Sequence, residues 1–201
     1  MKFFARALSL ILHPLLMPTI ALAIIFNSGT YLSYISFEVQ RLIYLVVLVC
    51  TFIMPISILP FLYFNRNTNE RKYSSKQNKL LLHAIVLLSY FFAFYLFRRM
   101  SIPLFLQLFM FAAALTALIS TIISLKWKIS FHMISIGGLI GIILSVSIRL
   151  IIDLQLILLI SILLAGLLGF AQLYLNKHKA IQVYVGFGFG LLSILSFMLL
   201  Y

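Results

Sequence analysis

The chain contains seven apolar runs, each long enough to cross the hydrocarbon core of a bilayer. That core is about 30 Å thick, so a helix needs about 20 apolar residues to span it. Helices are the expected form for such runs, because in lipid a helix satisfies its own backbone hydrogen bonds. The runs cover residues 7–26, 42–64, 80–97, 104–125, 131–152, 154–175 and 181–201.

The composition leaves no soluble alternative. Hydrophobic residues make up 64% of the chain and charged residues 9%, against roughly 25% charged in an ordinary soluble protein. Too few polar side chains are present to cover a soluble surface, which excludes soluble enzymes and disordered tails. Cys50 is the single cysteine, which excludes a disulfide scaffold. We therefore predict an all-α polytopic membrane helix bundle, with residues 1–201 forming a single integral membrane domain.

The charge is strongly basic, with 15 Lys and Arg against 3 Asp and Glu. Most of the cations fall in short loops, which favours anionic lipid headgroups or a phosphorylated substrate as partners. No charge run is long enough for a nucleic-acid-binding arm, so we expect no nucleic acid partner. Loops on the N-terminal side carry 11 of the cations and the opposite side 4. The positive-inside rule then predicts a cytoplasmic N-terminus and an external C-terminus in the inner (plasma) membrane.

Small residues and aromatic residues suggest how the helices pack. Pairs of small residues four apart lie in the fifth, sixth and seventh runs, at Gly137 and Gly141, Ala165 and Gly169, and Gly186 and Gly190. Because such pairs let backbones approach closely, we expect these three helices to form a tight bundle. The third run is rich in Phe and Tyr between residues 90 and 97, and we expect it to face lipid. Prolines at 14, 18, 55 and 60 should break or kink the first two runs.

Three polar stretches interrupt the apolar pattern, at residues 65–79, 126–132 and 172–182. Two predicted helices separate the first stretch from the second, and two more separate the second from the third. By parity all three stretches lie on one face of the membrane. Two histidines, a serine and several lysines are therefore expected to meet there.

The chemistry open to that group of residues is narrow. Glu70 is the one acid on that side, and no cysteine joins the histidines, so a zinc site would lack ligands and a serine hydrolase would lack its orienting acid. We expect neither a metal nor another cofactor. An anion does fit, because Ser130 and His132 lie at the start of a predicted helix, where free N–H groups favour phosphate. His178 and Gln182 are four apart and would share a helix face.

At these residues the sequence resembles the type 2 phosphatidic acid phosphatase superfamily, which is built on a six-helix membrane core. The family shows the motifs K-x6-R-P, P-S-G-H and S-R-x5-H-x3-D, in that order. The second resembles residues 129–132, with Ser130 and His132 retained. The third resembles residues 171–182, with the spacing and His178 retained. The first resembles residues 72–80, with Lys72 retained and Lys79 in place of arginine. The resemblance covers about residues 65–190.

The resemblance implies metal-independent removal of phosphate from a lipid or polyprenyl phosphate. His178 would be the nucleophile that forms a phospho-histidine, and His132 would protonate the leaving group. Lys72, Lys79 and Ser130 would hold the phosphate oxygens. The family's bacterial members commonly act at the outer face of the inner membrane, whereas the loop charges predict a cytoplasmic site here.

Two substitutions weaken the expected chemistry. Gln172 stands where the family has an arginine that grips phosphate with two hydrogen bonds, and glutamine has neither the charge nor the fork. Gln182 stands where a carboxylate orients the nucleophilic histidine, and an amide cannot stabilise the imidazolium as an anion does.

Three classes of function stay open. The first is a lipid phosphate phosphatase, and the second is a catalytically silent relative that serves as a structural or accessory subunit of a larger membrane complex. The third is a small transporter or channel, which has least support because the runs hold almost no mid-membrane charge and no inverted repeat is evident. Membrane lipids are expected partners in each case.

Overall fold

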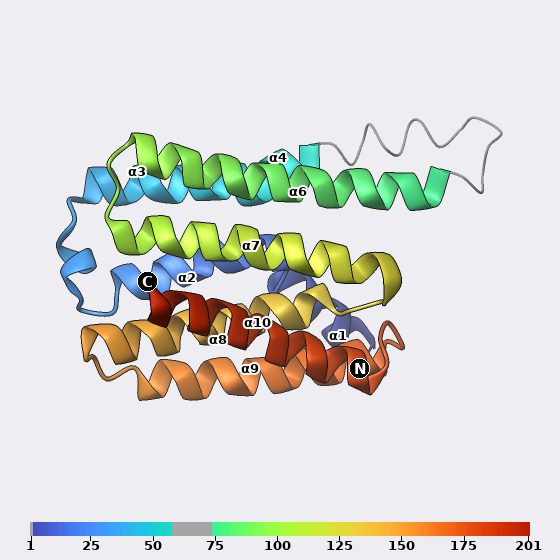
Figure 1. Cartoon of the computed structure of the whole chain (residues 1–201). Helices are drawn as coiled ribbons and strands as arrows, with labels where there is room; N and C mark the ends of the chain where they lie inside the picture. The colour runs from blue at the N-terminus through green and yellow to red at the C-terminus, as the bar shows by residue number, and fades with distance from the viewer. Residues whose placement is uncertain (1, 58–73) are drawn as a thin grey trace.

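The computed structural model describes residues 2–57 and 74–201, and for residues 74–80 it describes the backbone alone. The described chain is all-helical (Figure 1). Its α-helices are α1 (Lys2–Ile11), α2 (Met17–Phe26), α3 (Phe37–Leu48), α4 (Met54–Ser57), α6 (Ser74–Arg99), α7 (Leu104–Lys126), α8 (Phe131–Leu150), α9 (Gln155–Tyr174) and α10 (Ala180–Leu200).

The predicted polytopic helix bundle is confirmed, because seven helical segments of the described chain are long and apolar enough to cross a membrane. The first two of these segments join shorter helices, Lys2–Phe26 from α1 and α2, and Phe37–Ser57 from α3 and α4. The predicted second run, 42–64, therefore begins five residues too late, and its last residues lie outside the described part. The third span, in α6, lies in a longer helix that begins at Ser74.

The first span is broken where the prolines predict. α1 ends at Ile11, a short 3₁₀ turn follows at Pro14–Leu16, and α2 begins at Met17. Proline has no N–H to donate, so backbone carbonyls near the break need other donors. Thr51, in the second span, supplies one of them: its hydroxyl donates to the Leu15 carbonyl at 3.0 Å. The break thereby joins the first two spans.

α8 and α10 pack closest of all the described helices. A side-chain carbon at Gly190 would overlap the carbonyl oxygen of Ile134, and one at Gly137 would overlap that of Phe187. The two glycines therefore let each helix rest directly on the backbone of the other. This contact confirms close packing of the fifth and seventh helices, as their small-residue spacing predicts. α9 packs less extensively against α10 than against α8.

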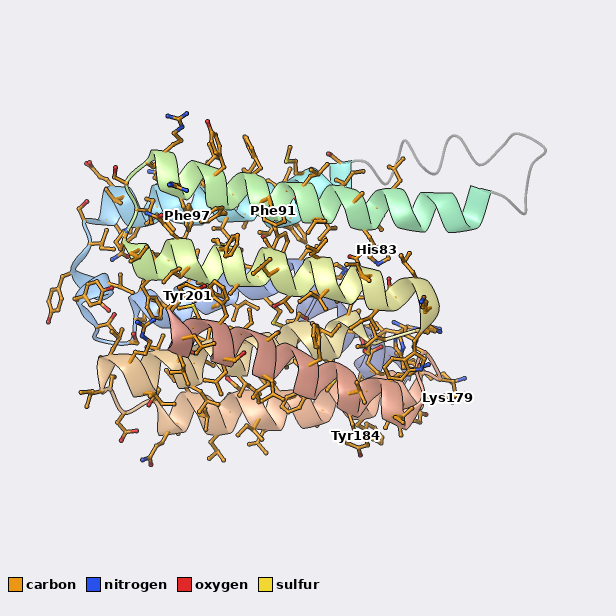
Figure 2. The ribbon with its side chains drawn as sticks, in the orientation of Figure 1. His83, Phe91, Phe97, Lys179, Tyr184 and Tyr201 are labelled. Carbon is orange, nitrogen blue, oxygen red and sulfur yellow. The ribbon has the colours of Figure 1, made fainter. Side chains whose placement is uncertain are left out.

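The expectation that the third span faces lipid along its aromatic residues holds for one side of the helix, where Phe92 and Tyr95 are exposed, and is wrong for the other side. Phe97 is fully buried and Tyr90 is 7% exposed, and Figure 2 shows Phe97 between α6 and α7. Phe91 and Phe94 pack against Phe111 of α7, with ring centroids 6.2 and 5.0 Å apart. Aromatic side chains suit a helix interface as well as they suit lipid, so composition alone does not separate the two.

The ends of the helices place the polar stretches together. The N-terminus, the connection from α7 to α8 and the connection from α9 to α10 lie at one end of the bundle, and the C-terminus lies at the other end (Figure 1). The parity argument is thus confirmed for the stretches at 126–132 and 172–182. Most of the stretch at 65–79 lies outside the described residues.

The backbone contact at Gly190 predicts a sharp difference between two neighbouring glycines. Gly190→Ala should destabilise the protein by about 1–3 kcal/mol, because α8 and α10 must separate to admit the methyl group. Gly188→Ala is the matched control, since nothing lies within 4 Å of a side-chain carbon there. Thermal unfolding in detergent measures both, and equal midpoints for the two variants would contradict the proposed contact.

Candidate functional site

The loops before α8 and before α10 are joined by a hydrogen bond. The Lys128 ammonium donates to the carbonyl oxygen of Lys177 at 2.8 Å. The α7–α8 and α9–α10 connections therefore meet at one end of the bundle, and they bring two cations with them. The structure places Lys128 near His178, whose ring lies within range of its charge.

A tight turn at the end of α9 sets the position of His178. Asn176 adopts a left-handed conformation with φ of 51°. The N–H of Lys177 bonds to the Gln172 carbonyl at 3.2 Å, and the N–H of Asn176 bonds to the Leu173 carbonyl at 2.9 Å. This pair of bonds is a Schellman motif, which reverses the chain directly after a helix. Asparagine tolerates the left-handed region better than most residues. The turn leaves His178 two residues before α10.

His178 is held by Gln182, as their spacing predicts. The Nδ1 atom of His178 lies 3.3 Å from Oε1 of Gln182. The backbone N–H of Lys179 also donates to this oxygen, at 3.0 Å, which identifies the atom as the acceptor end of the amide. Nδ1 of His178 must therefore carry the hydrogen. In the neutral ring Nε2 then keeps a free lone pair.

The surroundings of His178 favour this neutral ring. Burial lowers the pKa of the His178 imidazole below its ordinary value of 6.5, and the positive charges of Lys128 and Lys177 lower it further. The hydrogen bond to Gln182 acts in the opposite direction and raises the pKa. A neutral imidazole with a free Nε2 is the form that can act as a nucleophile.

The second histidine is tied to the first helix. Nε2 of His132 lies 3.1 Å from the carbonyl oxygen of Ser9. A carbonyl accepts only, so Nε2 of His132 carries a hydrogen. The Ser9 hydroxyl accepts a hydrogen bond from the Gln172 amide at 3.1 Å and donates to the Ala5 carbonyl at 2.9 Å. Ser9 therefore links His132 on α8 to Gln172 on α9.

We call Ser9, His132, Gln172, His178 and Gln182 the polar cluster. Its members lie at one end of the bundle, and His132 lies within electrostatic range of Lys177 and His178. Gln172 is fully buried, and its Oε1 atom has no hydrogen-bond partner. The cluster thus retains an unused acceptor in its interior.

Ser130 caps the N-terminus of α8, as predicted, but its hydroxyl does not bond to the helix. The residue is fully buried, and its Oγ atom has no hydrogen-bond partner. Gly186 of α10 lies against the Ser130 carbonyl, where an added side-chain carbon would be 3.0 Å from the oxygen. α10 therefore covers the start of α8 from one side.

The structure brings together part of the predicted site. His132, His178, Gln172 and Gln182 meet in the polar cluster, and Ser130 lies at the start of the same helix as His132. Lys72 lies outside the described residues; Lys79 lies in α6, where the side chain is not described.

Sequence reasoning missed Ser9, and it did not place His13 in the site. The His13 ring stands edge-on to that of His132, with centroids 5.8 Å apart. Both residues lie in the first span, ahead of the region that carries the family resemblance. Polar side chains at membrane depth were the available signal.

No metal site is formed by the described part of the chain, where no three His, Cys, Asp or Glu side chains group together. Described acids lie elsewhere: Asp153 lies just before α9, where its carboxylate accepts from the N–H of Gln155 at 2.9 Å. The polar cluster is thus made of histidine rings, amides and a hydroxyl, with lysines at its edge. Such a set can bind an anion and can offer an imidazole nitrogen as a nucleophile.

Comparison with known proteins adds no assignment. No family model matches the chain, and neither a curated protein nor a solved structure matches it.

The bond between His178 and Gln182 predicts the titration of the histidine. In Gln182→Glu the pKa of His178 should rise above that of the wild type, because a carboxylate stabilises the imidazolium. In Gln182→Ala it should fall below the wild type, because the hydrogen bond that raises the pKa is lost. NMR titration of isotope-labelled histidine measures both. Gln155→Glu adds the same charge at an exposed site on the opposite face and should leave His178 unchanged; an equal shift there would contradict a direct bond.

Proposed function

We propose that this integral membrane protein binds the phosphate group of a lipid or polyprenyl phosphate at the polar cluster and removes it through His178. The observation that carries the proposal is the hydrogen bond from His178 Nδ1 to Gln182 Oε1. It orients the ring as a nucleophilic histidine requires, with the lone pair of Nε2 free. The residues retained in the divergent motifs, Ser130, His132 and His178, support the same function. So does the resemblance to a family with a six-helix core.

The residues around His178 suit a phosphate. Lys128 and Lys177 are positively charged, and both lie within electrostatic range of the ring. The N-terminus of α8 adds unpaired N–H groups, which favour an anion. In this arrangement the two lysines take over part of the charge that the family draws from the arginine at the position of Gln172.

The proposed reaction has two steps. Nε2 of His178 attacks phosphorus, an N–P bond forms, and the bond from phosphorus to the lipid oxygen breaks. The leaving lipid oxygen takes a proton and departs as an alcohol; water then attacks the phospho-histidine and releases phosphate. His132 is the proposed acid. Because its Nε2–H bonds to the Ser9 carbonyl, the transferred proton must come from Nδ1, and the ring must be protonated at both nitrogens.

A second function is favoured by the same geometry of His132 and Gln172. The Nε2–H of His132 and the amide of Gln172 both donate to Ser9, and Gln172 is fully buried. Groups that serve a phosphatase as acid and phosphate ligand are here engaged in holding α1. A catalytically silent relative would use them in this way, as a lipid-phosphate-binding or accessory subunit of a membrane complex.

Phosphate release from purified protein separates the two functions. A panel of lipid phosphates and polyprenyl pyrophosphates is tested with the wild type, His178→Ala and Gln172→Arg. We expect release by the wild type, none by His178→Ala because the nucleophile is absent, and faster release by Gln172→Arg if the arginine reaches the phosphate. Arg99→Ala, on the opposite face, is the control and should keep the wild-type rate.

The outcomes point in different directions. Release that persists in His178→Ala would rule out His178 as the nucleophile. If the wild type releases no phosphate, binding of the lipid phosphate is measured instead. Salt-sensitive binding that weakens in a Lys128→Ala, Lys177→Ala double variant would favour the silent binding protein.

We also propose an inner (plasma) membrane location with the polar cluster on the cytoplasmic side. The support is the excess of cations on that side, 11 against 4, and the positive-inside rule. The native cysteine does not interfere with a labelling test, because Cys50 is buried. An impermeant thiol reagent on intact cells should label Asp153→Cys and leave Lys177→Cys unlabelled. The reverse pattern would place the cluster on the outer face.

A further inference from the structure

A cavity of about 840 Å³ lies beside the polar cluster, and its lining comes from the first two spans and from α6, α7, α8 and α10. Its walls are mostly apolar, and they include Tyr90, Phe109, Leu139 and Ile194. A volume of this size is typical of sites that bind small molecules. In a bilayer such a space suits a hydrocarbon chain.

Three hydroxyl side chains line the cavity close to the end that holds the polar cluster: Ser120, Thr121 and Ser135. Counted along their helices at about 1.5 Å per residue, they lie about 6–9 Å from the helix ends on that side. Polar groups are therefore present near one end of the cavity, as a lipid with a single polar head would require.

The hydrogens of these hydroxyls are already used. Ser120 and Thr121 both donate to the carbonyl of Ala117, at 3.0 and 2.7 Å, and Ser135 donates to the carbonyl of His132 at 3.0 Å. Each hydroxyl oxygen keeps lone pairs that can accept. Toward the cavity these residues therefore act as hydrogen-bond acceptors, which select a ligand that donates.

His13 supplies the complementary group. Its Nδ1 accepts a hydrogen bond from the N–H of Leu15 at 3.3 Å, so in the neutral ring Nε2 carries the hydrogen and donates. Among the residues that the structure describes, those that line the cavity include no Lys, Arg, Asp or Glu. An uncharged head that both donates and accepts fits this wall.

We propose that the cavity binds a long-chain or polyprenyl alcohol, with its hydroxyl at the acceptor oxygens of α7 and α8 and its chain among the apolar residues. An ester carbonyl accepts only and would leave those oxygens without a donor. A phosphate would bring a charge among described wall residues that include no lysine or arginine, which is costly at membrane depth. The alcohol site is distinct from the phosphate site at His178, and binding there needs no hydrolysis.

Photolabelling tests the proposal with a defined probe. A hexadecanol that carries a diazirine in its chain is bound to the purified protein in detergent, and the cross-links are mapped by mass spectrometry. Free hexadecanol should compete for labelling, and hexadecyl methyl ether should compete about fivefold more weakly, because it cannot donate a hydrogen bond. Hexadecyl phosphate should also be a weaker competitor at the sites mapped to the cavity.

Matched substitutions locate the site. Ala113 and Ala117 line the cavity from α7, and a phenylalanine at either should fill it and reduce labelling at least about fivefold. Ala84 is exposed on α6 and does not line the cavity, so Ala84→Phe should label like the wild type. If both α7 variants fail to fold, the competition between alcohol and ether in the wild type still tests whether the cavity selects a ligand that donates a hydrogen bond.

Two results would overturn the proposal. Equal competition by the alcohol and its methyl ether would mean that the cavity holds any apolar chain, such as that of a phospholipid. Wild-type labelling in folded Ala113→Phe and Ala117→Phe would place the probe elsewhere. Labelling is measured without turnover, so the two proposals can fail separately. Normal labelling without phosphate release would contradict only the proposed phosphatase. Phosphate release without labelling of the cavity would contradict only the alcohol site.

Discussion

The candidate site depends on the close approach of α8 and α10. Lipid supplies no hydrophobic force between helices, so geometry and direct contact must hold them together. Backbone meets backbone at Gly137 and Gly190, and the two helix starts are thereby fixed beside each other. Ser130 at the start of α8 and Gln182 in the first turn of α10 take their positions from that contact, and His178 takes its position from Gln182.

The two histidines of the polar cluster are held in opposite hydrogen-bonding states. His178 uses its Nδ1 hydrogen on an amide and leaves Nε2 free, whereas His132 uses its Nε2 hydrogen on a backbone carbonyl. Both partners are uncharged, so each ring is oriented without a compensating negative charge. This separates two roles that a carboxylate would combine. Each ring is oriented, but neither hydrogen-bond partner would stabilise the charged form of the ring as a carboxylate does.

Sequence reasoning succeeded where one physical factor dominates. Apolar length alone predicts the spans. The small-residue pairs predict a tight bundle of the fifth, sixth and seventh helices, and the structure confirms it for the contact between the fifth and the seventh. Sequence reasoning was half right for the third span, where Phe92 and Tyr95 are exposed but Tyr90 and Phe97 are buried. Protein-facing and lipid-facing surfaces are both apolar in a membrane, so the sequence did not distinguish the two sides. Within the site, the spacing of His178 and Gln182 predicted a shared helix face; their side chains do meet, although His178 lies before α10. Ser9 could not be found this way, since its partners lie far away in sequence.

The hydrogen bonds of Ser9 have a consequence for the order in which the protein is made. Ser9 bonds to His132 and Gln172, which follow it by 123 and 163 residues. The first helix is therefore synthesised long before its polar partners exist, and contacts this distant in sequence form late. The ribosome and the insertion machinery must deliver α9 to the membrane before Ser9 has all of its hydrogen-bond partners. Assembly of the cluster is thus a closing event, and it joins an early segment of the nascent chain to segments that are made much later.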